Sequence, residues 1–304
     1  MGASTSVEAL FFEFDIFLLT KENEIAKLSN MKKIALVNDL TGFGRCSIAV
    51  ELPIISALKV QVCPLPTAIL SVHTGFKNYF LDDYTEKMTP YIESWQKNKL
   101  KFDGIATGFL GSAAQIEIVS NFLEKFSAPT LIDPVMGDHG KIYASYTREM
   151  CVKMRRLLKF ADLVTPNLTE ACELLNVPYP AGGVISDSDL ATMAANIAAK
   201  TRGERVIITG INFDFDDGKN IANFIYDKGK IDVVTSLKLG SDRSGTGDVF
   251  FAIVAANFVK GKNLNESVRQ AADFVTKCIV EAEIIGLKWN EGLPFEEFLT
   301  DLKN

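Results

Sequence analysis

Short apolar runs alternate with longer segments of helical periodicity from Met31 to the end of the chain. Apolar runs of about four to eight residues are typical of buried strands, whereas apolar residues spaced three and four apart are typical of packed helices. The predicted strands are Ile34–Val37, Gln61–Leu65, Gly104–Thr107, Thr130–Ile132, Asp162–Val164, Arg205–Thr209, Ile221–Tyr226 and Ile231–Thr235. The predicted helices are Ser47–Leu58, Asp83–Asn98, Ala113–Lys125, Ser145–Leu158, Leu168–Leu175, Ser188–Lys200, Gly247–Lys260, Leu264–Ala282 and Pro294–Leu302. This alternation predicts an α/β fold with a mainly parallel sheet.

The last two predicted strands interrupt the parallel pattern. They are joined by Asp227-Lys228-Gly229-Lys230, which is typical of a tight hairpin loop. The pattern contains neither an internal repeat nor a low-complexity linker, so we expect residues 31–304 to form one domain.

Residues 1–30 differ from this pattern. The apolar run 11–19 is interrupted by Glu13 and Asp15, no basic region precedes it, and no small-residue cleavage site follows it. Because Met31 introduces an ordinary first strand, we expect residues 1–30 to be an N-terminal extension or a cloning-derived segment outside the fold.

Composition narrows the class of protein. The 304 residues are 47% hydrophobic and 23% charged, with a formal net charge of −6, which argues against a nucleic-acid or anionic-membrane partner. The five cysteines show no C-x-x-C spacing, which fits a reducing cytosol rather than a disulfide framework or a zinc site. Only two histidines are present, so His-rich metal chemistry is excluded.

The segment with the strongest chemical signal is Gly245-Thr246-Gly247-Asp248, which leads into an apolar helix. Two glycines allow backbone N–H groups to point toward one position, and the start of the helix adds unpaired N–H groups and a positive dipole end. A carboxylate beside such an anion site suggests phosphoryl transfer to a hydroxyl group. The alternative is a helix that is capped by Ser244 or Thr246, with Asp248 only complementing the dipole.

This segment resembles the signature of the ribokinase-type sugar and vitamin kinases, and further motifs in the family's order resemble its pyridoxal kinase branch. The motifs are His73-Thr74-Gly75, Asp133-Pro134-Val135-Met136-Gly137-Asp138, Thr165-Pro166-Asn167-Leu168-Thr169-Glu170 and Gly245-Thr246-Gly247-Asp248. The resemblance implies a ribokinase-like three-layer α/β/α sandwich and a cytoplasmic homodimeric enzyme that uses ATP and Mg²⁺. It leaves a monovalent cation requirement open.

Four positions correspond to the vitamin pocket of that family. Thr74 and His73 match residues of the pocket, and Phe109 stands where an aromatic residue covers the substrate. Asp39 stands where pyridoxal kinases have a serine, and a carboxylate there could favour an amine-bearing substrate such as pyridoxamine. Three of these positions also have a structural alternative: Asp39 as a turn aspartate, His73 as a structural histidine and Phe109 as a core aromatic residue.

The remaining positions correspond to the metal and nucleotide sites. Asp133 and Asp138 follow one strand and could collect Mg²⁺ and the phosphates that it bridges. The resemblance also assigns Asn167 and Glu170 to the Mg²⁺–phosphate site, with Glu170 as a further metal residue. The alternative for these two residues is a capping box at the start of a helix. The matching nucleotide-side residues are Thr165, Asn167, Glu170 and Thr209.

These observations together predict a kinase of a vitamin B6 form in which Asp248 takes the proton of the 5′-hydroxymethyl group and Gly245, Thr246 and Gly247 hold the phosphoryl group. An alternative is hydroxymethylpyrimidine kinase of thiamine synthesis, whose members typically carry Cys at the position of Asp248. A catalytically silent ligand-binding relative is another, but the glycines and the base are present. The P-loop and G-x-G-x-x-G motifs are missing, which argues against a P-loop kinase and a Rossmann oxidoreductase.

Overall fold

A computed structural model of the chain describes residues 31–212 and 219–303. It separates two compact units, residues 1–32 and 33–304, and the description below concerns the second. The prediction for residues 1–30 lies outside the described residues.

A nine-stranded sheet forms the centre of the described residues, in the order β11-β10-β9-β8-β5-β4-β1-β2-β3. Its strands are β1 (Lys33–Thr41), β2 (Gln61–Leu70), β3 (Leu81–Asp83), β4 (Gly104–Thr107), β5 (Thr130–Ile132), β8 (Leu163–Val164), β9 (Arg205–Ile211), β10 (Asn220–Asp227) and β11 (Lys230–Leu237). The six strands from β9 to β2 are parallel to one another, while β3, β10 and β11 pair antiparallel at the two edges.

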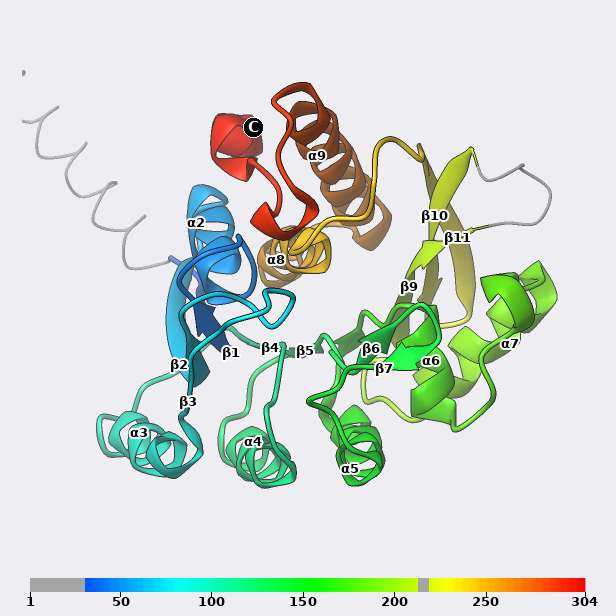
Figure 1. Cartoon of the computed structure of the whole chain (residues 1–304). Helices are drawn as coiled ribbons and strands as arrows, with labels where there is room; N and C mark the ends of the chain where they lie inside the picture. Colours follow the sequence, from blue (N-terminus) through cyan, green and yellow to red (C-terminus); the bar gives the residue numbers. More distant parts are fainter. Residues whose placement is uncertain (1–30, 213–218, 304) are drawn as a thin grey trace, which may run out of the picture. The chain divides into compact units, whose positions relative to one another are not determined.

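Helices cover both faces of the sheet, as Figure 1 shows. One face carries α2 (Ile48–Ala57), α8 (Thr246–Val259), α9 (Leu264–Ile284) and the C-terminal 3₁₀ segment η5 (Phe295–Lys303). The other carries α3 (Thr85–Lys97), α4 (Ala113–Lys125), α5 (Arg148–Leu157), α6 (Leu168–Leu175) and α7 (Asp187–Ala198). Alternate residues of β1 enter the two layers: Ile34 and Leu36 pack with α8, whereas Ala35 and Val37 pack with α4. These three layers, with a mainly parallel sheet, confirm the predicted fold class.

Helix α8 is apolar on all sides, which is typical of a helix buried within a protein. Every residue from Val249 to Ala256 is buried, between α2 and α9. This packing fixes the start of α8, where Asp248 stands, at the carboxyl edge of the sheet.

Most predicted elements are present, and the structure differs from the prediction in several details. The helix expected from Asp83 begins at Thr85, because Leu81–Asp83 pairs with β2 and the Asp83 carboxylate accepts the Thr85 amide hydrogen. The C-terminal segment forms 3₁₀ rather than α-helical turns. A hairpin of two two-residue strands, β6 (Gly137–Asp138) and β7 (Lys141–Ile142), lies in a segment for which no strand was predicted, since runs this short give no periodic signal.

Within residues 31–212 and 219–303, no helix is both long enough and apolar enough to cross a membrane.

Candidate active site

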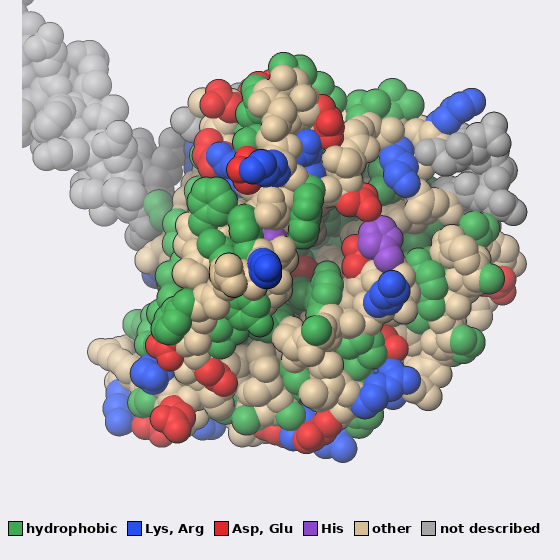
Figure 2. Space-filling view, in the orientation of Figure 1, with side chains coloured by type: hydrophobic (Ala, Val, Ile, Leu, Met, Phe, Trp, Pro, Cys, Tyr) green, Lys and Arg blue, Asp and Glu red, His purple; other side chains and the backbone are tan. Residues whose placement is uncertain are grey.

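The parallel strands end at one edge of the sheet, so the segments that follow them come together there. Asn38 and Asp39 lie near the carboxyl end of β1, Asp133 follows β5, and Thr165 follows β8. Figure 2 shows this face hollowed at its centre, with acidic side chains at the border of the hollow. Open α/β sheets bind ligands at this edge.

The segment Arg243–Asp248, called the anion loop below, turns into α8 at Gly245. Gly245 is the N-cap residue with φ +76°, and a Cβ there would overlap the Arg45 carbonyl oxygen. Within the described chain no side chain caps this helix, and the Thr246 hydroxyl instead donates to the Arg243 carbonyl at 2.9 Å. The alternative of a helix capped by Ser244 or Thr246 is therefore wrong, and the first N–H groups of α8 are left for a ligand.

The second glycine of the loop has a different environment from the first. Gly247 is exposed, has no positive φ, and a Cβ there would meet no atom within 4 Å. The fold itself therefore does not require glycine at this position. The open space lies directly in front of the start of α8, where an anion would bind.

Asp248 lies close to two further carboxyl groups, those of Glu51 and Asp133, and the three are called the acid cluster below. Burial, together with the Asp39 charge, raises the pKa of Asp248 to about 6, against hydrogen bonds from the Ser47 backbone and the Asn38 side chain that lower it. At neutral pH the Asp248 carboxylate is therefore mainly ionised, with a pKa close to the range in which a general base works best.

A second acid of this cluster, Glu51 on α2, is fully buried. Its Oε2 accepts a hydrogen bond from Asn38 Nδ2 at 2.9 Å, and its Oε1 has no partner among the described residues. Burial raises the pKa of Glu51 well above its ordinary value, and the Asp248 charge acts in the same direction. Because the Asn38 amide contacts both acids, it links Glu51 to Asp248.

Asp133 is the third member of the acid cluster. Burial raises the pKa of Asp133 to about 8, helped by repulsion from Asp248 and opposed by a long hydrogen bond of 3.4 Å from the Thr165 hydroxyl to Oδ1. Such neighbouring carboxyl groups hold their full negative charge only when a cation or a basic group compensates it.

Glu170 and Asn167 form the predicted capping box at the start of α6. The Asn167 side chain accepts the Glu170 amide hydrogen at 3.0 Å, and Glu170 Oε2 accepts the Asn167 amide hydrogen at 2.9 Å. Glu170 Oε1 accepts from the Met136 amide at 3.1 Å, and Asn167 Nδ2 donates to the Gly137 carbonyl at 2.8 Å. Both side chains are used to hold the 133–138 segment, so a contact with a metal would pass through water.

The carboxyl groups that were predicted to bind Mg²⁺ differ in how well they suit a metal ion. In the described part of the chain, no three His, Cys, Asp or Glu side chains are placed to hold a metal ion together. Asp138 is exposed, and its Oδ1 accepts the His139 amide hydrogen at 2.8 Å. Asp133, with a raised pKa and no hydrogen bond to Oδ2 from a described residue, is the carboxyl group that suits a cation bridging phosphates.

Asp39 is buried and bonded on both carboxylate oxygens. The Ser47 hydroxyl donates to Oδ1 at 2.6 Å and the Thr41 hydroxyl to Oδ2 at 2.7 Å. Burial raises the pKa of Asp39, and these two hydrogen bonds lower it. Asp39 therefore fixes the loop that follows β1, and any effect on an amine-bearing ligand would act through its charge.

An aromatic cluster forms the wall on the β2 side of the edge. His73 lies 4.9 Å from Phe76 and 6.1 Å from Trp289 between ring centroids, and Phe43 lies 5.7 Å from Phe76. Both His73 nitrogens are bonded: Nδ1 accepts the Gly75 amide hydrogen, so Nε2 donates to the Asn290 carbonyl at 2.9 Å. In this arrangement His73 offers a ligand its ring rather than a hydrogen-bonding nitrogen.

Three further predicted residues have simple positions. Thr74 is exposed beside His73. Phe109 is half-buried, its amide donates to Asn38 Oδ1 at 2.8 Å, and its carbonyl accepts from the Thr67 hydroxyl. Thr209 is half-buried near the end of β9, where its amide donates to the Pro166 carbonyl at 2.9 Å.

Sequence reasoning missed Asn38, Glu51 and Trp289. In the sequence, Glu51 is one residue of the predicted helix Ser47–Leu58, and none of the motifs above contains Asn38 or Trp289. A charged residue in the middle of the run Ile48–Ile55 was the available signal, because an acid is rarely buried without a partner or a function.

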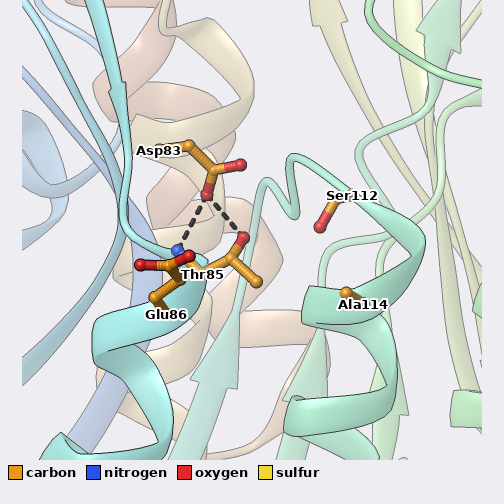
Figure 3. A pocket seen from close by; sticks show the side chains of 5 residues that line it. All are labelled: Asp83, Thr85, Glu86, Ser112 and Ala114. Carbon is orange, nitrogen blue, oxygen red and sulfur yellow. Dashed lines mark hydrogen bonds between the residues drawn. The ribbon is translucent and has the colours of Figure 1, made fainter.

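A separate surface pocket of about 400 Å³ lies between the starts of α3 and α4. Figure 3 shows its lining of Asp83, Thr85, Glu86, Ser112 and Ala114. Its main acid, Asp83, accepts hydrogen bonds from Thr85 and from the Gln115 side chain, and thereby joins the two helices. This pocket therefore has a structural explanation, and we place the chemistry at the acid cluster.

Comparison with known proteins relates the chain to one group of kinases. Residues 54–292 match the model of a family described as phosphomethylpyrimidine kinase. A hydroxymethylpyrimidine/phosphomethylpyrimidine kinase of Haemophilus influenzae is 29% identical over 193 residues, which cover 62% of this chain and 70% of the relative. The thiamine biosynthetic bifunctional enzyme TH1 of Arabidopsis thaliana is 22% identical over 92% of this chain, and this chain spans 52% of that relative.

Two solved structures are similar to this chain in fold. A candidate phosphomethylpyrimidine kinase from Bacteroides thetaiotaomicron, crystallised with pyridoxal, has a TM-score of 0.84 and 36% identity, covering 90% of this chain and 96% of that one. Pyridoxal kinase from Leishmania donovani, in complex with ADP and pyridoxamine, has a TM-score of 0.79 and 21% identity, covering 90% and 96%. The second likeness concerns the fold alone.

Proposed function

Because the chain belongs to the phosphomethylpyrimidine kinase family, we propose that it transfers the γ-phosphoryl group of ATP to a hydroxymethyl group on a flat heteroaromatic ring. A form of vitamin B6 is the first candidate acceptor. The observation that supports the transfer chemistry is Asp248 beside an uncapped helix start: a base with a pKa of about 6 next to an anion site.

In the proposed reaction Asp248 accepts the proton of the acceptor hydroxyl as its oxygen attacks the γ-phosphorus. The bond between that phosphorus and the β–γ bridging oxygen breaks, which leaves ADP and the phosphorylated acceptor. The amides of Gly245, Thr246 and Gly247 stabilise the charge on the transferring group. Asp133 would hold Mg²⁺ together with phosphate oxygens and water, and the ion would supply the charge compensation that this acid cluster needs.

The aromatic cluster supports a flat acceptor. His73, Phe76, Phe43 and Trp289 offer ring faces and edges, and the His73 nitrogens are already bonded. Aromatic side chains can stack on a planar ring or contact it edge-to-face. The Bacteroides structure with pyridoxal, at 36% identity, favours vitamin B6 among such rings.

Hydroxymethylpyrimidine is the second candidate acceptor. It is supported by the family match and by the Haemophilus relative, which is named for this activity. Because the Asp39 charge acts on Asp248, the proposed base, a cationic pyridoxamine is also a candidate among the B6 forms.

A steady-state comparison of pyridoxal, pyridoxamine, pyridoxine and hydroxymethylpyrimidine, each with ATP and Mg²⁺, tests the proposal. We expect the highest kcat/KM with one of the three B6 forms. A value for hydroxymethylpyrimidine at least about tenfold above all three would replace the first candidate by the second. No transfer to any of the four, with ATP bound, would contradict the proposed function.

A further inference from the structure

The C-terminal turn, Trp289–Glu291, contacts three segments of the site through its backbone. The Trp289 carbonyl accepts the Ser244 amide hydrogen at 3.1 Å, and the Asn290 carbonyl accepts from His73 Nε2 at 2.9 Å. The Glu291 carbonyl accepts from Arg45 Nη1 at 3.1 Å. Three consecutive carbonyl oxygens thus accept hydrogen bonds from the start of the anion loop, from His73 of the aromatic cluster and from the segment after β1.

Side-chain packing supports the same arrangement. The Trp289 ring lies against His73, and a Cβ on Gly75 would come within 2.8 Å of Trp289 Cη2. On the other side, the Arg45 carbonyl packs directly on Gly245 of the anion loop. Arg45 is also held by Glu296, with 2.9 Å between Nε and Oε1.

The chain leaves the C-terminal turn at a residue that permits little change. Gly292 has φ +78°, and a Cβ there would come within 2.6 Å of Arg45 Cβ and 2.7 Å of the Gly44 carbonyl oxygen. A side chain at Gly292 would therefore strain the backbone and also push the turn away from Arg45.

From these contacts we propose that the C-terminal turn is a positioning element, which holds His73 of the acceptor side and Ser244 of the anion loop in one fixed relation. This inference rests on the proposed function, because it concerns how the two halves of that site are held. It follows that a nucleotide at the anion loop affects His73 through the turn, and that acceptor and nucleotide bind with a mutual coupling.

The chain offers a matched pair of glycines for the test. Gly286 also has a positive φ, of 67°, but a Cβ there would meet no atom within 4 Å. Gly286→Ala therefore introduces backbone strain without displacing the turn, whereas Gly292→Ala introduces both. Neither glycine lies in the acid cluster or in the anion loop.

The first readout is the proton NMR spectrum of the ring of His73, which is easily assigned because the sequence has only one other histidine, His139. We expect Mg-ADP alone, with no acceptor, to shift the His73 signal in the wild type and in Gly286→Ala but not in Gly292→Ala. His139→Gln identifies the second signal.

The second readout is the change in acceptor Kd on adding ADP, measured by calorimetry with pyridoxal. We expect Gly292→Ala to reduce this coupling by about fivefold or more, and Gly286→Ala to leave it within about twofold. Identical coupling in the two variants, or a wild-type His73 signal that does not respond to bound ADP, would overturn the inference. Failure of the proposed function looks different: bound ADP shifts His73, yet no acceptor is phosphorylated.

Discussion

The side-chain amide of Asn38 donates a hydrogen bond of 2.9 Å to Glu51 Oε2, while the other carboxyl oxygen of this buried glutamate has no partner among the described residues. The same amide also contacts Asp248, so a buried acid of α2 is connected to the proposed base. We therefore expect Glu51 to act as a positioning residue for Asp248.

Two substitutions of Glu51 distinguish the effect of its hydrogen bond to Asn38 from the effect of its charge. Because burial raises the pKa of Glu51 well above its ordinary value, we expect Glu51→Gln, which is uncharged and keeps an oxygen for Asn38, to retain kcat within about fivefold at pH 7. Glu51→Ala leaves a cavity and an unbonded Asn38, and should lose about 2–5 kcal/mol of unfolding free energy along with most activity. A hundredfold loss of kcat in Glu51→Gln would instead mean that an ionised Glu51 is required.

The two glycines of the anion loop should respond in opposite ways. Gly245→Ala places a methyl group against the Arg45 carbonyl at a positive φ, and should lower the unfolding free energy by about 1–3 kcal/mol or more. Gly247→Ala meets no atom, so Tm should stay unchanged or rise slightly. We nevertheless expect Gly247→Ala to reduce kcat/KM for ATP strongly, because the methyl group occupies the proposed phosphate position. Full activity in Gly247→Ala would place the phosphate elsewhere.

Asp133 makes the stability of the ligand-free protein depend on pH. Its pKa is raised to about 8, so the folded protein binds this proton more tightly than the unfolded chain does. The destabilisation is small below a pH of about 4, grows as pH rises, and is complete above about 8. We expect Tm of Asp133→Asn minus Tm of the wild type to increase between pH 5 and pH 8. Asp138→Asn, at an exposed carboxyl group, is the control, and an equal increase there would contradict the assignment to burial.

The activity should depend on pH in the opposite sense. Asp248 acts as a base only when ionised, and its pKa is about 6. We therefore expect kcat/KM for the acceptor to rise as pH increases from 5 to 7 and then to level off. A profile that is flat over this range, with ATP binding unchanged, would remove Asp248 as the titrating group.

Most of the fold could be predicted from the sequence, because long periodic segments specify their own structure. The helix Gly247–Lys260 was expected almost where α8 lies, and the hairpin around Asp227–Lys230 joins β10 and β11. The 81–83 strand could not be predicted, since its pairing with β2 depends on a neighbour distant in sequence. Such short elements are formed by tertiary contacts rather than by local pattern.

The site could be predicted where its contacts lie within one short sequence motif. Gly245 combines a positive φ with close packing, and the Asn167–Glu170 capping box follows from spacing alone. The partnership of Asn38 with Glu51 and the contact of His73 with Asn290 join residues 13 and 217 positions apart. No local pattern predicts such contacts, and the second of them occupies His73 Nε2.

The most direct test of the proposed mechanism is Asp248→Asn. Asparagine keeps the size of the side chain but cannot accept the acceptor's proton, while the amides of Gly245, Thr246 and Gly247 remain. General-base catalysis contributes about 10²–10⁴ in rate, so kcat should fall by that factor while KM for ATP changes little. If Asp248 only complemented the helix dipole, the substitution would cost about 0.3–1 kcal/mol of stability and leave turnover largely intact. Measured on one variant, a loss of kcat with Tm preserved supports the account, and wild-type turnover contradicts it.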